Sequence, residues 1–233
     1  MLLELLGPAK KSVLEVCCGT GRVLIPLARA GHQSTGIDSD EAMLKRLAAK
    51  AEGLENIEAV NADALCANWG EGFDAVILTC NSLMNVTHSG DGREAQIKII
   101  SKAAGALAPG GHFFLASDSY PEPEKIFVAQ NYLLSGAHSG TDDGGVFGQV
   151  FDCGGLYNPI TRIAVWNGHT EFTLPGGETF TVSDYGSKYV SECQEVREWL
   201  RAAGFAIERE YGGFDKRPFT GAAGWDVIWA RKL

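Results

Sequence analysis

The residues with the clearest chemical meaning lie in a glycine-rich stretch near the N-terminus, residues 13–22, which reads VLEVCCGTGR. An apolar run precedes the glycines and a helical pattern follows them, so they stand at a strand-to-helix turn. Glycines there let a ligand approach the backbone, and the first helical turn offers free N–H groups. Asp38 ends the next expected strand, 17 residues after Gly21, where a carboxylate can accept both hydrogens of a ribose diol. These features indicate a site for a nucleoside cofactor without saying which one.

The details of the turn disfavour a dinucleotide. A dinucleotide fingerprint needs a third glycine or an alanine, but counting from Gly19 that position holds Leu24. Glu15 precedes the turn, and a carboxylate suits a ligand with an ammonium or sulfonium end better than a diphosphate. Glu15 and Asp38 each interrupt a strand that otherwise looks buried. An unpaired buried carboxylate costs several kcal/mol, which favours a ligand-binding role for both.

Alternating strand and helix patterns must position these residues. Strands are expected at 12–17, 33–38, 56–61, 73–79 and 112–117, and helices at 21–30, 41–51 and 93–107. A helix at 193–203 and strands at 205–211 and 225–231 close the chain. Strands separated by helices predict an α/β fold, in which a doubly wound, mostly parallel sheet carries helices on both faces.

The pattern changes in the second half of the chain. Strand-like runs occur at 146–152, 160–166, 171–174 and 179–185, with turn residues at Asn167-Gly168 and at 175–177. This predicts an antiparallel insertion, preceded by a Gly/Ser/Asp-rich connection. We therefore expect an α/β domain of residues 1–118 and 191–233, with residues 119–190 inserted within the same single domain.

Composition excludes several classes of function. The chain of 233 residues has 20 Lys and Arg against 29 Asp and Glu, a net charge of −9, and no basic run, so nucleic acid is not expected as a partner. No apolar stretch is long enough to span a bilayer, and Lys10 and Lys11 follow the short apolar start instead of preceding it, so a cytoplasmic protein is expected. The six cysteines form no Cys-x-x-Cys, which predicts neither a metal site nor a disulfide framework.

Five motifs, in order and spread over nearly the whole chain, resemble those of the class I S-adenosylmethionine-dependent methyltransferases. They are the glycine turn of 15–21, the segment 36–39 followed by Met43, the segment 61–64, the Pro-Gly-Gly turn of 107–111, and the ending from Gly204 onward. The resemblance implies a seven-stranded Rossmann-like sheet, a late antiparallel cap, and S-adenosyl-L-methionine as cofactor.

The resemblance also implies roles for single residues. Glu15 would face the methionine ammonium, Asp38 the ribose, and Asp63 the adenine amino group. The backbone of Cys17, Gly19 and Gly21 would face the ligand, Ser39, Met43 and Ala64 would contact the adenine, and Cys80 and Asn81 would lie near the sulfonium. Two alternatives stay open: Met43 as a core residue of its helix, and Asp63 as a loop or cap aspartate.

The acceptor side resembles small bacterial methyltransferases that act on amino acids, amino sugars and natural products. The segment 79–85, TCNSLMN, lacks the motifs of DNA-methylating relatives. We expect transfer to a nitrogen of a small-molecule acceptor by a monomer or homodimer, with Asn81, His88 and Tyr157 as positioning residues. Tyr157 is expected in a turn beside Asn158-Pro159, and the alternative for His88 is a solvated loop histidine. Other open functions are an O-methyltransferase acting on a small hydroxylated natural product, a non-catalytic cofactor-binding protein and, less favoured, a NAD-dependent oxidoreductase.

Overall fold

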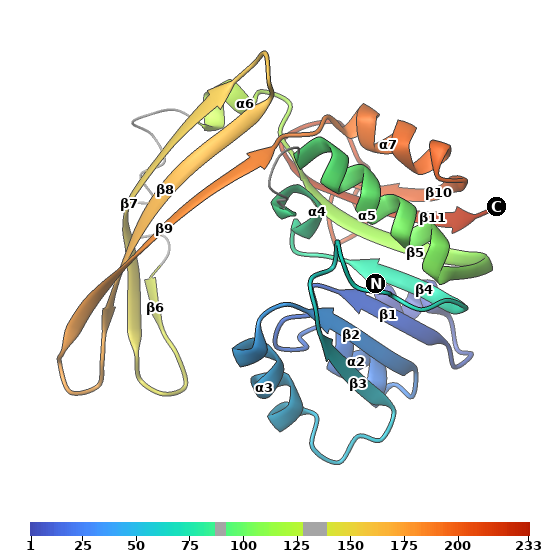
Figure 1. Cartoon of the computed structure of the whole chain (residues 1–233), viewed down its shortest axis with the longest axis horizontal. Coiled ribbons are helices and arrows are strands. Elements are labelled where there is room, and N and C mark those ends of the chain that lie inside the picture. The colour runs from blue at the N-terminus through green and yellow to red at the C-terminus, as the bar shows by residue number, and fades with distance from the viewer. Residues whose placement is uncertain (87–91, 128–138) are drawn as a thin grey trace. The chain divides into compact units, whose positions relative to one another are not determined.

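A computed structural model describes residues 1–86, 92–127 and 139–233 (Figure 1). The chain divides into two compact units. The first, which we call the α/β unit, consists of Met1–Ser119 and Glu192–Leu233. The second, the β unit, is Tyr120–Ser191.

The α/β unit is built on a seven-stranded sheet of order β10-β11-β5-β4-β1-β2-β3. Its strands are β1 (Ser12–Val16), β2 (Gln33–Asp38), β3 (Ile57–Asn61), β4 (Phe73–Leu78), β5 (Leu107–Ser119), β10 (Phe205–Tyr211) and β11 (Gly224–Lys232). The first five strands pair in parallel, whereas β11 runs antiparallel to both β5 and β10. The predicted fold class, an α/β fold with a mostly parallel seven-stranded sheet, is confirmed.

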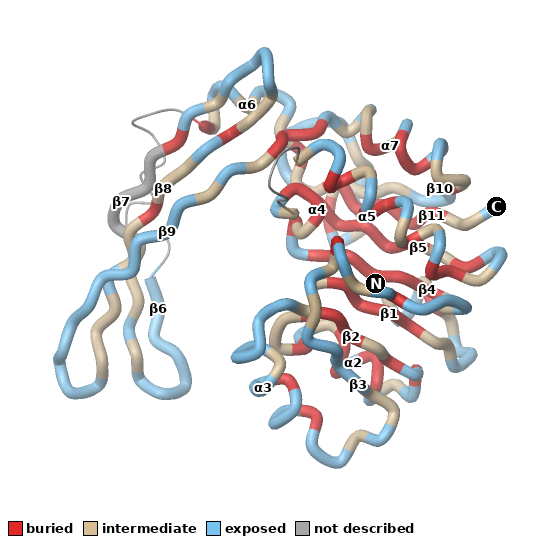
Figure 2. Tube along the Cα trace, in the orientation of Figure 1, coloured by how far each residue is buried: buried red, intermediate tan, exposed pale blue. Residues whose placement is uncertain are grey.

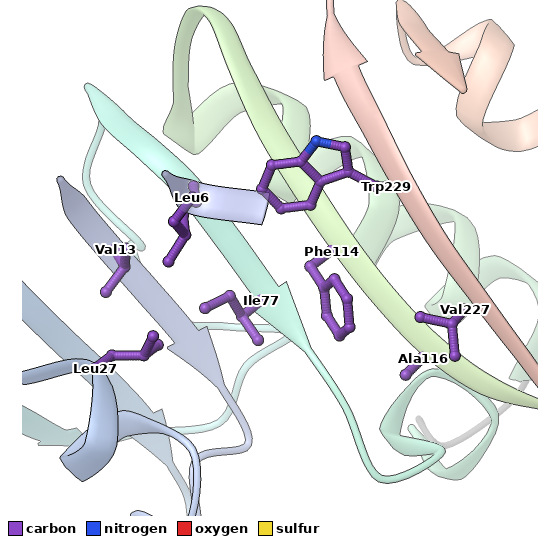
Figure 3. Close-up of a cluster of buried hydrophobic side chains, with 9 residues drawn as sticks. Leu6, Val13, Leu27, Ile77, Phe114, Ala116, Val227 and Trp229 are labelled. Atoms are coloured by element: carbon purple, nitrogen blue, oxygen red, sulfur yellow. The ribbon is translucent and has the colours of Figure 1, made fainter. Parts of the chain in front are cut away.

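Helices cover both faces of this sheet. They are α1 (Leu2–Leu6), α2 (Leu24–Arg29), α3 (Glu41–Lys50), α4 (Ser82–Asn85), α5 (Gly92–Ala106) and α7 (Cys193–Ala202). Figure 3 shows Leu6 of α1 and Leu27 of α2 over the central strands. They join one buried cluster with Val13, Ala75, Ile77, Phe114, Ala116, Val227 and Trp229. Successive strand residues point to opposite faces, so the alternate residues of β4 and β5 face α5, which packs against both strands and against α7.

The helix after the glycine turn begins later than the sequence pattern predicts. It was expected from residue 21, but α2 begins at Leu24. Gly19 and Gly21 have backbone φ angles of 53° and 77°, in the left-handed region, which a right-handed helix cannot contain. The turn therefore ends only after Gly21. The short helices α1 and α4 were not predicted, because four or five residues carry too little periodicity.

The β unit is an antiparallel sheet of order β6-β7-β8-β9 with one short helix, α6 (Pro123–Ile126). Its strands are β6 (Ser139–Thr141), β7 (Phe147–Asn158), β8 (Ile163–Thr173) and β9 (Thr179–Tyr189). The turn predicted at 175–177 is present, since the N–H of Gly177 donates to the Leu174 carbonyl at 2.8 Å. Figure 2 shows that these strands are far less buried than the central strands of the α/β unit.

Two predictions for the β unit are wrong. Asn167-Gly168 is not a turn: Asn167 pairs with Gly154 on one side and Tyr185 on the other, so ladders on both sides hold the backbone extended. Tyr157 is not in a turn either, because it pairs with Ala164 inside the β7–β8 ladder. The turn lies beyond the end of β7, at residues 159–162. There the Asn158 side chain accepts the N–H groups of residues 160 and 161 at 2.9 and 3.1 Å.

In the β unit, the side chain of Lys188 lies among three aromatic rings. The Lys188 ammonium lies 5.2 Å from the Tyr120 ring centroid, 5.4 Å from that of Phe127 and 5.1 Å from that of Trp166. The ring of Trp166 lies directly over Gly186, where a Cβ atom would be 2.0 Å from a ring carbon. These cation–π contacts thus connect the residues that flank α6 to strands β8 and β9. No helix in the described ranges is long and apolar enough to cross a membrane.

Candidate active site

Strained backbone marks the carboxyl ends of two neighbouring central strands. Cys17 follows β1 and has a φ angle of 59°. Cys80 and Asn81 follow β4, and each also has a φ angle of 59°. Left-handed φ angles are uncommon for residues with side chains, and such strain gathers at functional sites. Since β1 and β4 are parallel neighbours, the three residues lie at the same edge of the sheet.

The Asp38 carboxylate is held in place by backbone groups from two elements. The Gly19 N–H donates to Asp38 Oδ2 at 2.8 Å, and the Asp40 N–H donates to Asp38 Oδ1 at 2.9 Å. Asp40 in turn caps α3, because its Oδ1 accepts the N–H groups of Ala42 and Met43 at 2.8 and 3.0 Å. Asp38 thereby ties the glycine turn to the start of α3. Each of its oxygens retains a lone pair for a ligand hydroxyl.

The two glycines of the turn serve different purposes. A Cβ atom on Gly19 would have Met43 Sδ as its nearest neighbour, at 3.7 Å, so the surface above Gly19 is open to a ligand. A Cβ atom on Gly21 would lie 3.0 Å from Ile25 and from Leu47, in the core between α2 and α3. For Gly21 we therefore correct the expected reason: the side chain is absent to allow helix packing, not to make room for a ligand.

A cavity of about 330 Å³ lies at this edge of the sheet. We call it the acidic cavity, because Asp38 and Asp63 are part of its wall. Five residues expected to bind the cofactor line it: Cys17, Asp38, Ser39, Asp63 and Ala64. Its wall also contains Ile37, Ala62, Leu65, Asn85 and Val86, which the sequence analysis did not single out. Asn85 and Val86 were missed because they belong to α4 and its end, an element with no clear sequence pattern.

The structure decides between the alternatives for Met43 and bears on those for Asp63. Met43 is 44% exposed, so it is not a core residue of α3, and its sulfur lies near the turn at Gly19. Asp63 Oδ1 accepts the N–H of Leu65 at 2.7 Å. Asp63 is therefore a loop-capping aspartate through one oxygen. This leaves its second oxygen as the candidate acceptor for a ligand amino group.

Glu15 is buried within β1 and is 2% exposed. Burial raises the pKa of its carboxyl from an ordinary 4.5 to about 8, although a hydrogen bond from the Leu24 backbone and the charge of Arg22 oppose that rise. Oε2 has no hydrogen-bond partner among the described residues. Glu15 lines neither the acidic cavity nor the second cavity described below. It therefore supports the glycine turn from beneath through Leu24, and contact with a ligand ammonium stays a prediction.

Cys80 and Asn81 have different surroundings although they are neighbours in sequence. The exposed Cys80 thiol accepts a hydrogen bond from Arg22 Nη2 at 2.6 Å. Asn81 is buried, and its Oδ1 accepts from the Ser117 hydroxyl and the Asp118 N–H, both at 3.0 Å. Asn81 therefore ties the end of β4 to β5. This geometry favours a positioning role over direct contact with an acceptor.

The other two acceptor-side candidates are His88 and Tyr157. His88 lies outside the described residues. Tyr157 belongs to the β unit, where it packs against a cluster of Phe127, Ala164 and Val190. Its expected role toward the acceptor stays a prediction.

The donor set fits a nucleoside with a positively charged extension. It offers an open glycine turn, a fixed carboxylate for a diol, an exposed thioether beside the turn, and a second carboxylate in the wall of the cavity. The buried Oε2 atom of Glu15 is a further acceptor below the turn. These are the groups that S-adenosylmethionine requires.

Comparisons with known proteins agree with this assignment. Residues 13–111 match a family model described as a methyltransferase domain. A ubiquinone biosynthesis O-methyltransferase of Acinetobacter baumannii is 32% identical over 143 residues, which are 59% of this chain. The chain spans 57% of the length of that relative.

Solved structures share the fold across nearly the whole chain. The CcbJ methyltransferase of Streptomyces caelestis has a TM-score of 0.73 at 21% identity, covering 97% of this chain and 84% of that one. The sugar N-methyltransferase KedS8 of a Streptoalloteichus species has a TM-score of 0.69 at 18% identity, covering 100% and 84%. An S-adenosylmethionine-dependent methyltransferase of Clostridium acetobutylicum has a TM-score of 0.74 at 15% identity, covering 95% and 83%. Residues 13–111 thus match the model of a methyltransferase domain, and the chain has the fold of solved S-adenosylmethionine-dependent methyltransferases.

Proposed function

We propose that the protein transfers a methyl group from S-adenosylmethionine to a nitrogen of a small-molecule acceptor. The observation that carries the proposal is the Asp38 carboxylate, fixed by the Gly19 and Asp40 N–H groups on the wall of the acidic cavity. Two hydrogen bonds from a ribose diol to this carboxylate would be charge-assisted and therefore strong. Asp63 and Ala64 line the same cavity, which supports them as the residues that would contact the adenine.

When bound, the cofactor supplies an electrophilic methyl group on a sulfonium. The chain's own contribution is to hold the two reactants at the right distance and angle, which removes most of the entropic cost of their encounter. Asn81 fixes the end of β4 through β5, and Cys80 and Arg22 fix the surface beside it. A base is needed only where the acceptor nitrogen arrives protonated, so no single side chain is expected to be indispensable.

The accepting atom has two candidates, each with its own support. Nitrogen is favoured because structural neighbours include a sugar N-methyltransferase and an amino pentose methyltransferase. Oxygen is the second candidate, because the curated relative with 32% identity is named an O-methyltransferase. A small-molecule acceptor is part of the proposal in both cases.

A methyl-transfer screen tests the proposal. The protein is incubated with cofactor labelled in its methyl group and with panels of amines and phenols, and transferred label is measured. Asp38→Ala serves as the negative variant, and Glu58→Ala, which removes an exposed carboxylate from β3, serves as its charge-matched control. Label transferred to amines by the wild type and the control, but not by Asp38→Ala, supports the proposal.

Calorimetry with S-adenosylhomocysteine and with NAD is the second test. Tighter binding of NAD than of S-adenosylhomocysteine would overturn the proposal.

A further inference from the structure

A second cavity, of about 400 Å³, lies beside the glycine turn within the α/β unit. We call it the apolar cavity, because most of its wall is aliphatic or aromatic: Met1, Leu2, Val23, Phe114, Phe214 and Trp225. Arg22, Thr79 and Cys80 complete the wall. It thus lies against the turn that follows β1 and against the end of β4, the same edge of the sheet that carries the acidic cavity.

The apolar part of the wall is suited to a flat or compact hydrophobic body. Phe114 is a fully buried residue of β5, and its ring belongs to the cluster shown in Figure 3. Phe214 and Trp225 form an edge-to-face pair with ring centroids 5.1 Å apart. Ligand pockets of a few hundred Å³ with aromatic walls and a few polar groups are typical small-molecule sites.

Arg22 is the charged side chain of this wall, and its hydrogen bonding leaves it suited to an anion. Among the described residues, the guanidinium donates to the Cys80 thiol, with Nη2 2.6 Å from Sγ. A thiol is a neutral and weak acceptor, whereas a guanidinium matches the two oxygens of a carboxylate. The Thr79 hydroxyl contacts the same thiol at 3.5 Å, so the residues that follow β4 help to hold this geometry.

We propose that the apolar cavity is the methyl-acceptor site and that it takes an aromatic or alicyclic molecule carrying an anionic group, which pairs with Arg22. The inference rests on the proposed function, because it names the acceptor class of the same enzyme. The cofactor also has a carboxylate, on its short polar methionyl chain. An apolar ring fits this wall better than that chain does.

Matched probe pairs test the proposal by equilibrium binding in the presence of saturating S-adenosylhomocysteine. The first pair is 4-(aminomethyl)benzoate and benzylamine, and the second is 3-hydroxybenzoate and phenol. In each pair one member has the carboxylate and the other lacks it. We expect the wild type to bind the carboxylate members at least tenfold more tightly, as measured by calorimetry or ligand-observed NMR. Equal binding within both pairs would overturn the proposal.

Two variants on the same stretch of chain locate the effect. Arg22→Gln should reduce the preference for the carboxylate members to less than twofold. Arg29→Gln removes an exposed arginine at the end of α2, outside the cavity wall, and should leave the preference unchanged. Phe214 is 47% exposed, so Phe214→Ala should fold normally and weaken both members of each pair by a similar factor. A preference that survives in Arg22→Gln would contradict the assignment.

A cofactor titration separates the two possible sources of the anion. S-adenosylhomocysteine should bind Arg22→Gln within threefold of its affinity for the wild type. A loss of tenfold or more would assign the guanidinium to the cofactor's own carboxylate and overturn the acceptor assignment. Failure of the proposed function is distinguishable, because the wild type would then fail to bind S-adenosylhomocysteine. A wild type that methylates benzylamine faster than its carboxylate partner would overturn this inference alone.

Discussion

The Asp38 carboxylate connects the glycine turn, the start of α3 and the acidic cavity. Its oxygens accept the N–H groups of Gly19 and Asp40, and the residue also lines the acidic cavity. Asp38 is partly buried, and a diol that donates to both of its oxygens would form charge-assisted hydrogen bonds with it. The side chain therefore orders the turn, and under the proposed function it would also contribute to cofactor affinity.

Replacing Asp38 should weaken cofactor binding without unfolding the protein. We expect Asp38→Ala to reduce the affinity for S-adenosylhomocysteine by about tenfold to about 150-fold, which corresponds to ~1.5–3 kcal/mol from two lost charge-assisted hydrogen bonds. Calorimetric titration measures the affinity, and circular dichroism confirms the fold. Glu58→Ala is the control for the change in charge. Unchanged affinity in a folded Asp38→Ala protein would remove the ribose assignment.

Glu15 makes a separate prediction about pH and stability. Burial raises the pKa of this carboxyl to about 8 in the folded protein, whereas the unfolded chain has the ordinary value of 4.5. The protonated form is thus favoured by folding. This contribution to the free energy of unfolding is fully present below pH 4.5 and is lost as the pH rises to 8. The loss is at most about 1.4 kcal/mol per pH unit.

The comparison with Glu15→Gln isolates this residue from other titrating groups, such as Asp226, whose pKa burial raises to about 6. Glutamine keeps the shape but does not titrate. Urea unfolding at pH 5, 6, 7 and 8 should show the wild type losing stability relative to the variant at each step. Parallel curves for the two proteins would mean that Glu15 is ionised throughout and that its burial is compensated by a neighbouring charge.

Among the elements, the glycine turn between β1 and α2 should separate an effect on stability from an effect on cofactor affinity. Gly21→Ala forces a side chain into a left-handed φ and into contact with Ile25 and Leu47, so we expect a loss of about 2–4 kcal/mol in the free energy of unfolding. Gly19→Val meets open space and should cost about 1–2 kcal/mol in stability, from its φ alone, but reduce cofactor affinity at least a hundredfold. Denaturant unfolding and calorimetry measure both effects. The prediction is wrong if Gly19→Val binds the cofactor normally.

Particular elements show which parts of the fold could be predicted from the sequence. The strand at 33–38 was predicted to the residue, because Gly31 ends the preceding helix and polar residues follow Asp38. The start of α2 was misplaced, because periodicity does not report the sign of a φ angle. The Asn167-Gly168 dipeptide is a turn signal that pairing on both sides overrides.

The site was predictable in the same uneven way. The spacing pointed to Asp38 and the family resemblance to Asp63, and both residues line the acidic cavity. Their contacts with a cofactor stay predictions. Asn85 and Arg22 were not singled out, because their places in the two cavities follow from the short helix after β4 and from a turn geometry that single residues do not encode. Long-range contacts of this kind require the fold.

At the scale of the whole molecule, the chain leaves the α/β unit after Ser119 and returns at Glu192. The two ends of this excursion lie together, since the Cys193 thiol donates to the Ser119 hydroxyl at 3.3 Å within the α/β unit. The buried clusters are also separate: one contains residues of the α/β unit, and another contains Phe127, Ala164 and Val190 of the β unit. A unit with its own core is expected to fold alone.

Excising the β unit should therefore separate cofactor binding from methyl transfer. We join Ser119 to Glu192 by about three glycine and serine residues, because that length spans the short distance between ends that are in hydrogen-bond contact. The shortened protein should unfold cooperatively and bind S-adenosylhomocysteine within about fivefold of the full chain, since the walls of both cavities come from the α/β unit. If the β unit covers the acceptor, as the family resemblance implies, single-turnover methyl transfer should fall by about a hundredfold or more, because water and misaligned acceptors are no longer excluded. Retention of full transfer would assign the β unit a role other than capping, whereas loss of cofactor binding in a folded protein would show that the β unit completes the cofactor site.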